Sequence, residues 1–347
     1  MAELVSLDEI RAAARRLNGV VVRTPLVPFP GAGGLIPAGA GQPPNLLVKP
    51  ESLQPTGAFK LRGAYNAISA LLAEEETNGV VAHSSGNHGL AVAYAAALLG
   101  VRAAIVVPDN APKVKTDAIE AARAELVRVR PALAARVEAA GHIARTRGYA
   151  QIPPFDDRRV IAGQGTVGLE IAEDCAGTPP RAVLVPVSGG GLISGIAVAI
   201  RALAPAARVI GVEPELAADA RESLHSGRRV AWPAADVART RADALRVEQV
   251  GELTFPHIRA LVSDIVTVSD DEMLAAVRRL ALQGRLVAEP GGAAAVAACL
   301  FRSAAELGLP PAGDSRQEPV VAVLSGGNID PSLLARILAP RTQSYTG

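Results

Sequence analysis

Short runs of β-branched and aliphatic residues alternate with helix-forming stretches along most of this 347-residue chain. Most of these stretches are long enough to form a crossover helix, which returns the chain to the same end of a sheet. The pattern therefore predicts a doubly wound α/β fold with mostly parallel strands. The predicted strands are residues 46–48, 80–82, 103–107, 126–129, 182–187, 209–212, 265–268 and 320–324.

Two local signals add to this pattern near the N-terminus. Ser6 and Glu9 have the spacing of a capping box, which predicts the start of a helix, and Gly19 marks its end. Residues 30–44 are rich in Gly, Pro and Ala without any period, which predicts an exposed loop.

The charge balance narrows the possible partners. The 35 Lys and Arg residues nearly cancel the 34 Asp and Glu residues, and no basic run stands out, so we expect neither a nucleic-acid nor a membrane partner. The longest apolar runs fall short of the roughly 20 residues of a membrane span. The N-terminus lacks the charged and apolar regions of a signal peptide, so we expect a cytoplasmic protein.

The cysteine content excludes two further classes of protein. Only Cys175 and Cys299 occur, far apart and each within an alanine-rich helical pattern. They are expected to be small buried apolar side chains, and neither a disulfide framework nor a zinc cluster can be built from them.

Lysine is rare in this chain, and one lysine lies in an unusual context. Arg supplies most of the positive charge, since only four lysines occur. Lys60 lies in a stretch of small residues with no acidic residue closer than Glu51, where a neutral, nucleophilic amine is plausible. The alternative is an ordinary helix lysine whose charge reaches solvent.

A glycine-rich turn follows the predicted strand 182–187 and precedes a predicted helix. Its residues Ser188, Gly189, Gly190 and Gly191 bring free N–H groups and a helix N-terminus together, an arrangement that binds phosphate. The turn also resembles a dinucleotide fingerprint, although Ser194 replaces the third glycine. A turn that binds no ligand is the remaining alternative.

Two further polar turns follow predicted strands. Residues 84–89 (SSGNHG) combine hydroxyl groups with a helix start and suit a carboxylate, whereas His88 alone is better explained as a hydrogen-bonded structural residue. Residues 325–328 (SGGN) follow the strand 320–324. All three turns lie where open α/β sheets bind ligands, at the carboxyl ends of strands.

Taken together, these features resemble the pyridoxal-phosphate enzymes of fold type II, in particular the serine/threonine dehydratase and serine racemase family. The resemblance covers nearly the whole chain, and the order and spacing of its motifs make it specific. It implies the tryptophan synthase β-like fold, with two open, twisted, mostly parallel sheets and helices on both faces. The matching segments are residues 57–64, 84–88, 107–113, 160–166, 189–195, 211–214, 289–290 and 325–330.

The resemblance assigns roles to individual residues. Lys60 would be the Schiff-base lysine and a catalytic residue, and Ser85 would act on the opposite face of the substrate. The other cofactor-binding residues would be Phe59, Asn87, Ser188, Gly189, Gly190, Gly191, Leu192, Glu289 and Ser325. The substrate carboxylate would be bound by Ser84, Ser85, Asn87 and His88.

The resemblance also implies a cation site. Glu213, Ala217 and Asp219 have the spacing at which cation-dependent members offer two carboxylates and a carbonyl to Mg²⁺ or Ca²⁺. An exposed helix start, where acidic residues are common, is the alternative.

The expected activity is β-elimination from a small hydroxyamino acid, most simply L-threonine or L-serine, giving 2-oxobutyrate or pyruvate and ammonia. Ser325 matches the residue that meets the pyridine nitrogen, and a hydroxyl there disfavours transamination. A serine racemase, a 3-hydroxyaspartate dehydratase and, from another class, a nicotinamide-dependent oxidoreductase remain alternatives. The resemblance also implies a homodimer.

The family fold predicts a division of the chain into two domains. We expect a large cofactor-binding domain made of residues 1–79 and 153–347. A small domain of residues 80–152 would be inserted between these segments, with the cofactor in the cleft.

Overall fold

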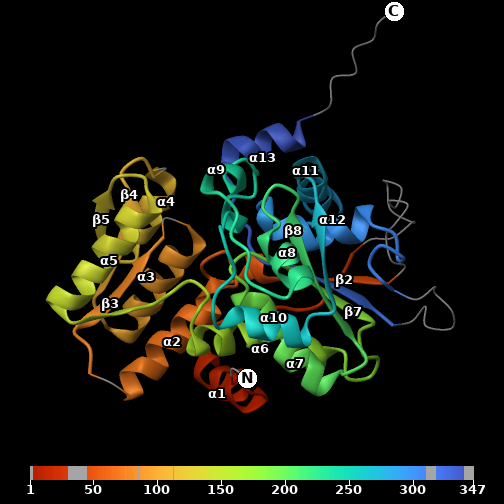
Figure 1. The fold of residues 1–347 in the computed structure, drawn as a ribbon, viewed down its shortest axis with the longest axis horizontal. Coiled ribbons are helices and arrows are strands. Elements are labelled where there is room, and N and C mark those ends of the chain that lie inside the picture. Colours follow the sequence, from red (N-terminus) through yellow and green to blue (C-terminus); the bar gives the residue numbers. More distant parts are fainter. Residues whose placement is uncertain are drawn as a thin grey trace, which may run out of the picture.

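The computed structural model describes residues 3–29, 45–74, 76–84, 86–111, 113–309 and 318–339. Within them the strands form two sheets, which lie side by side in Figure 1. The larger sheet has the order β1-β2-β10-β7-β8-β9 and the smaller one has the order β5-β4-β3-β6. The predicted loop 30–44 lies outside the described residues.

The strands of the larger sheet come from both ends of the chain. They are β1 (Val27–Pro28), β2 (Leu46–Pro50), β7 (Ala182–Pro186), β8 (Arg208–Pro214), β9 (Asp264–Val268) and β10 (Val320–Leu324). All neighbouring pairs are parallel except β1 with β2, which is antiparallel. The mostly parallel sheet predicted from the sequence is thus confirmed.

The strands of the smaller sheet come from one continuous part of the chain. They are β3 (Gly79–His83), β4 (Ala103–Pro108), β5 (Glu125–Val129) and β6 (Tyr149–Gln151), and all pair in parallel. All eight strands expected from the sequence are present, while the short strands β1 and β6 were not predicted. The domain limits themselves stay a prediction.

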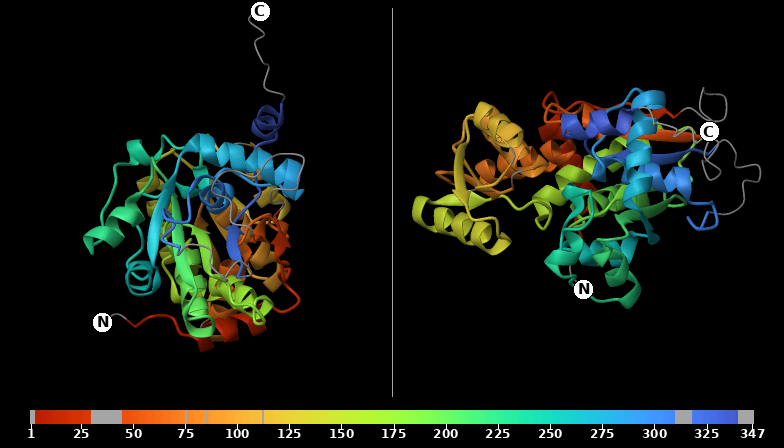
Figure 2. Two further views of the ribbon diagram at one scale, coloured as in Figure 1. Left: turned by 90° about the vertical axis from the view of Figure 1, so that its right-hand side faces the viewer. Right: turned by 90° about the horizontal axis from the view of Figure 1, so that it is seen from above.

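Helices cover both faces of both sheets, as Figures 1 and 2 show. Their bounds are α1 (Leu7–Leu17), α2 (Lys60–Glu74), α3 (Asn87–Leu99), α4 (Lys113–Ala121), α5 (Leu133–Arg147), α6 (Arg158–Asp174), α7 (Gly191–Leu203), α8 (Asp219–Ser226), α9 (Ala234–Val237), α10 (Thr254–Leu261), α11 (Asp270–Arg279), α12 (Ala294–Phe301) and α13 (Pro331–Leu338). Short helical turns are η1 (Glu51–Leu53), η2 (Asp243–Leu245), η3 (Leu280–Gly284) and η4 (Gly291–Ala293).

Alternation along the central strands separates two cores. Leu184 of β7 packs with α11 and α12 on one face of the larger sheet, whereas Val183 and Val185 pack with α6, α7 and α10 on the other. Successive side chains of a strand point to opposite faces, and a strand covered on both faces is apolar throughout. Full burial of one such side chain contributes about 1.5–3 kcal/mol.

The N-terminal helix and the two thiols follow the sequence predictions. The Ser6 hydroxyl accepts from the Glu9 N–H and the Glu9 carboxylate accepts from the Ser6 N–H, so the predicted capping box is confirmed. Cys175, at the end of α6, and Cys299, in α12, are both buried free thiols. Within the described part of the chain, no helix is long and apolar enough to cross a membrane.

Candidate active site

Lys60 begins α2, and its environment lowers the pKa of its amine. The Nζ atom donates to the carbonyl oxygen of Pro154 at 2.6 Å and lies 5.0 Å from the centroid of the Phe59 ring. Burial lowers the Lys60 pKa to about 8, because desolvation disfavours the ammonium form. Among the described residues, no carboxylate forms an ion pair with it. A low-pKa amine of this kind suits a covalent nucleophile better than a helix lysine whose charge reaches solvent.

The glycine turn after β7 is shaped by contacts that no larger residue would permit. Gly190 has a φ of +92°, a left-handed conformation that favours glycine. A Cβ on Gly189 would lie 2.2 Å from the ring of Phe155, which packs directly against the turn. Gly191 is the first residue of α7. The free N–H groups of the turn therefore lie at the N-terminus of this helix, where an anion can bind.

The lysine and the glycine turn are adjacent in space through one short segment. Pro154 holds the Lys60 amine and the next residue, Phe155, covers Gly189. A phosphorylated aldehyde needs an amine for its aldehyde and N–H groups for its phosphate, and residues 154–155 contact both the amine and the turn. The residues present therefore fit pyridoxal phosphate.

The chain after β10 lies against the two residues that precede Lys60. The Phe59 N–H donates to the Ser325 carbonyl at 3.0 Å, and Ala58 and Gly326 form an isolated antiparallel bridge. Ser325 is buried. Its position next to the Phe59–Lys60 pair is consistent with the predicted contact of its hydroxyl with the cofactor ring.

Asn87 connects the two sheets across the site. It begins α3, after β3 of the smaller sheet, and its Nδ2 donates to Glu289 Oε1 at 2.6 Å. Its Oδ1 accepts from Asn328 Nδ2 at 2.8 Å, and Asn328 also donates to the Thr56 carbonyl. Asn87 and Glu289 were predicted to bind the cofactor, whereas Asn328 was not included among the predicted site residues.

The other predicted substrate-binding residues lie around the same helix start. The Ser84 hydroxyl accepts from the Gly86 N–H at 3.2 Å, which forms a local turn. His88 is buried and its Nε2 donates to the Ile152 carbonyl, while burial and the nearby Lys60 charge lower its pKa to about 3. His88 is therefore neutral, as its structural interpretation requires. Ser85 lies outside the described residues.

Glu213 and Asp219 meet in a buried pair after β8. The Glu213 carboxylate accepts from the Ala220 and Arg221 N–H groups, whereas Asp219 Oδ2 is buried without a hydrogen-bond partner. Burial and the Asp219 charge raise the Glu213 pKa well above its ordinary value, and burial raises the Asp219 pKa to about 7. Ala217 is buried nearby in sequence. Two such carboxylates with an unpartnered oxygen fit a cation of the Mg²⁺ or Ca²⁺ type.

A buried ion cluster fixes the first turn of α2 behind Lys60. The Arg62 guanidinium bonds Glu51 at 2.7 Å and Glu170 at 2.6 Å, and Lys49 bonds the same Glu170 at 2.6 Å. Burial disfavours the Glu51 charge, but Arg62 outweighs this effect and holds the Glu51 pKa below its ordinary value. The sequence motifs did not reveal this cluster, because its members are scattered over more than 100 residues.

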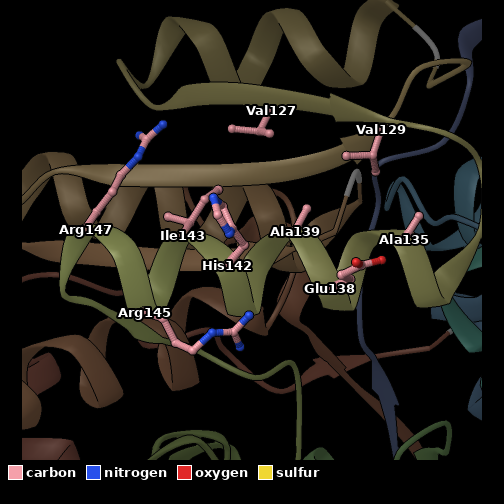
Figure 3. Close-up of a pocket in the computed structure, with 9 residues that line it drawn as sticks. All are labelled: Val127, Val129, Ala135, Glu138, Ala139, His142, Ile143, Arg145 and Arg147. Atoms are coloured by element: carbon pink, nitrogen blue, oxygen red, sulfur yellow. The ribbon is translucent and has the colours of Figure 1, made fainter.

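The cavity in Figure 3 lies elsewhere and does not belong to this site. It has a volume of about 490 Å³ and lies between β5 and α5 at the edge of the smaller sheet. Its lining includes Val127, His142 and Arg147, none of which was predicted to act in the site.

Residues 154–156 are the main functional segment that sequence reasoning missed. Pro154 and Phe155 contact the lysine and the glycine turn, and Asp156 contacts the start of α10. Their one sequence signal is their place immediately before the matching segment 160–166, with Asp157 as the cap of α6.

Comparison with known proteins identifies the class. The profile of the family described as "Pyridoxal-phosphate dependent enzyme" matches residues 4–326. The chain therefore belongs to the pyridoxal-phosphate dependent enzymes, and its fold is their type II fold. The nicotinamide-dependent alternative finds no support in this family.

Two relatives give the resemblance more detail. The L-threonine ammonia-lyase of Thermotoga maritima is 38% identical over 335 residues, covering 96% of this chain and 78% of the relative. Serine racemase of Arabidopsis thaliana is 38% identical over 329 residues, covering 95% of this chain and 94% of the relative.

Among solved structures, a threonine deaminase whose source is abbreviated T.th. has a TM-score of 0.81 and 43% identity over 94% of this chain and 99% of that one. Maize serine racemase has a TM-score of 0.85 and 34% identity over 96% and 97%.

Proposed function

We propose that this protein is a pyridoxal-phosphate dependent carbon–nitrogen lyase that converts L-threonine or L-serine to the corresponding 2-oxo acid and ammonia. The observation that carries the proposal is the low-pKa amine of Lys60, held by Pro154 beside the glycine turn. The 38% identity to L-threonine ammonia-lyase and to a catabolic L-threonine dehydratase of Escherichia coli supports this choice of substrate.

Each part of the site has a task in this reaction. When bound, pyridoxal phosphate withdraws electrons from the Cα atom of the amino acid. The N–H groups of the turn from Ser188 to Leu192 would bind its phosphate, and Phe59, Asn87, Glu289 and Ser325 would surround its ring. Lys60, as a free base with a pKa of about 8, would take the Cα proton.

The loop at the start of α3 would orient the substrate. The hydroxyls of Ser84 and Ser85, the Asn87 amide and the N–H groups at His88 would bind its carboxylate, helped by the helix dipole. Loss of the β-hydroxyl as water leaves an enamine, which hydrolyses to the 2-oxo acid and ammonia. The same site can racemise serine if Ser85 returns a proton to the opposite face of Cα, as the similarity to serine racemase allows.

The decisive experiment removes the amine. Lys60→Ala should abolish both the visible absorption of the bound cofactor and ammonia release from L-threonine. Lys60→Arg keeps a positive charge but cannot bond the aldehyde, so it serves as the matched control and should be equally inactive. Turnover retained by either variant would refute the assignment.

A second candidate substrate is 3-hydroxyaspartate, and Arg136 favours it. This residue of α5 lies near His83, the last residue of β3, and its Nε is buried without a partner. A buried guanidinium nitrogen without a partner, close to His83, the residue before Ser84, suits a second carboxylate on the substrate. An L-threo-3-hydroxyaspartate ammonia-lyase of Saccharomyces cerevisiae is also 38% identical. If the candidate is correct, Arg136→Met should reduce kcat/KM for 3-hydroxyaspartate and spare that for L-serine.

We further propose a Mg²⁺ or Ca²⁺ site at Glu213, Ala217 and Asp219, supported by the unpartnered Asp219 oxygen.

We also propose that the protein is a homodimer in the cytoplasm. The family resemblance supports the dimer. Light scattering of the purified protein would test the dimer.

A further inference from the structure

The helix α10 begins without a cap of its own. The residue at its N-terminal boundary is Leu253, whose side chain cannot accept a hydrogen bond from the free N–H groups of the first turn. A carboxylate from a distant part of the chain occupies this place instead. Asp156 Oδ1 accepts from the N–H groups of Leu253 at 2.8 Å and Thr254 at 3.3 Å, and its Oδ2 accepts from the Glu252 N–H at 2.9 Å.

The helix start that Asp156 holds is bonded to the glycine turn. The Thr254 hydroxyl donates to the Gly189 carbonyl at 2.7 Å, and the Gly251 N–H donates to the same oxygen at 3.2 Å. A Cβ on Gly190 would lie 2.9 Å from the Thr254 hydroxyl. The Gly189 carbonyl is thus turned toward α10, which leaves the N–H groups of the turn to face the site.

Contacts around Gly251 show how closely these parts fit. A Cβ on Gly251 would lie 2.0 Å from Asp156 Oδ1, so a larger residue there would displace the carboxylate. On the other side, the Ser194 hydroxyl of α7 donates to the Thr254 carbonyl at 3.3 Å. Asp156, α10 and the start of α7 therefore form one connected set of hydrogen bonds around the turn.

We propose that Asp156 is a positioning residue for the phosphate of the cofactor, acting through Thr254 on Gly189. The proposal rests on the proposed function, because it assumes that the glycine turn binds the phosphate of pyridoxal phosphate. Asp156 itself touches neither the amine nor the turn. Its effect is to hold the peptide of Gly189 in the orientation that presents the turn to an anion.

Asp157 provides a matched control from the neighbouring position. Its carboxylate also caps a helix, accepting from the Val160 N–H at 2.9 Å, but that helix is α6 and not α10. Asp156→Ala and Asp157→Ala each remove one capping carboxylate and so cost folding stability, with three accepted N–H groups lost in the first variant and one in the second. The two variants also differ in the capped helix, since α10 is bonded to the glycine turn through Thr254 whereas Asp157 caps α6.

The test is equilibrium binding of pyridoxal phosphate to the apo form of the full-length protein, followed by absorbance. Asp156→Ala should weaken binding about tenfold, as expected for loss of charge-assisted hydrogen bonds. Asp157→Ala should leave it within about twofold. Asp156→Asn keeps one oxygen acceptor and should be intermediate. This variant also serves if the alanine variant does not fold.

A double-mutant cycle tests the route through Thr254. Thr254→Val removes the hydroxyl that bonds Gly189, so its effect on affinity and that of Asp156→Ala should be strongly non-additive. Affinity for pyridoxal, which has the aldehyde but no phosphate, should change less than about twofold in Asp156→Ala.

Each contrary result has a defined meaning. Unchanged affinity in Asp156→Ala, an equal loss in Asp157→Ala, additive effects in the cycle, or an equal loss for pyridoxal would each overturn the proposal. If the wild-type protein does not bind pyridoxal phosphate, the proposed function fails instead, and the two failures are thereby distinguished.

Discussion

Nδ2 of Asn87 lies 2.6 Å from Oε1 of Glu289, although 202 residues separate the two in sequence. The contact joins the first residue of α3, the helix that follows β3 of the smaller sheet, to the segment that precedes η4. That segment belongs to the part of the chain that forms the larger sheet. Because Asn87 also accepts from Asn328, one amide connects three segments at the mouth of the site.

Asn87→Ala removes both of these hydrogen bonds. It should lower the free energy of unfolding by about 1–3 kcal/mol, since one of the two hydrogen bonds is made to a carboxylate. It should also reduce kcat/KM for L-threonine. Denaturant unfolding and steady-state kinetics measure the two effects, and Asn78→Ala, at the exposed end of the smaller sheet, is the control for loss of an Asn that bonds only backbone. Wild-type kinetics in Asn87→Ala would contradict the role of this amide.

Arg62→Met leaves two buried carboxylates without their main counter-charge. Removal of one partner from a buried ion pair costs about 3–5 kcal/mol, so this variant should be severely destabilised. The matched control is Arg23→Met, since Arg23 bonds Glu173 and Asp174 at the surface, where such pairs contribute about 0–1 kcal/mol. Thermal unfolding of the two variants checks the difference. Equal losses of stability would show that the buried ion cluster contributes no more to the free energy of unfolding than the surface ion pairs do.

Gly189→Ala places a methyl group where the Phe155 ring now lies, at 2.2 Å. Either the ring or the turn must move, so cofactor affinity should fall by at least about tenfold, corresponding to roughly 1.4 kcal/mol. Gly177→Ala is the control, because a Cβ there meets nothing within 4 Å. Titration of each apo-protein with pyridoxal phosphate measures the affinity, and a loss of equal size in both variants would argue against a role of the close Gly189–Phe155 contact in cofactor binding.

The rate at which the apo-protein incorporates its cofactor should depend on the ionisation of Lys60. With a pKa of about 8, the neutral fraction of the amine rises from about one tenth at pH 7 to about nine tenths at pH 9. The rate should therefore rise about tenfold over this interval and then level off. Stopped-flow absorbance measures it. A rate that continues to rise beyond pH 9 would indicate a lysine of ordinary pKa.

Stability of the metal-free protein should fall as pH rises from about 4 to about 7. The Asp219 pKa is raised to about 7 in the folded protein, so the folded state binds more protons than the unfolded state in this range. The stabilisation is complete below the unfolded pKa and is lost as pH passes the folded one. Addition of Mg²⁺ or Ca²⁺ should restore the melting temperature above pH 7. Asp219→Asn should reduce the pH dependence, the remainder of which comes from Glu213, because burial also raises the pKa of that carboxyl. Equal melting curves with cation and with chelator at pH 8 would remove support for the cation site.

The sequence predicted those features that leave a local pattern. The sequence allowed us to recognise eight strands, the capping box of Ser6 and the three polar turns. Each of these features depends only on residues that are close together in the chain. The sequence did not predict the partners of Lys60 and Gly189, since Pro154 and Phe155 form no motif and act through a carbonyl and a ring face. The Arg62 cluster and the cap supplied by Asp156 likewise depend on packing between residues about 100 apart.

The burial of both native thiols simplifies experiments on this protein. Burial raises the pKa of Cys175 and of Cys299, so the reactive thiolate is scarce in the native state. A cysteine introduced on the surface, for example by Glu138→Cys on α5, would then be alkylated alone. Fluorescent or spin labels can therefore be attached to α5, beside the smaller sheet, without any prior removal of the natural cysteines.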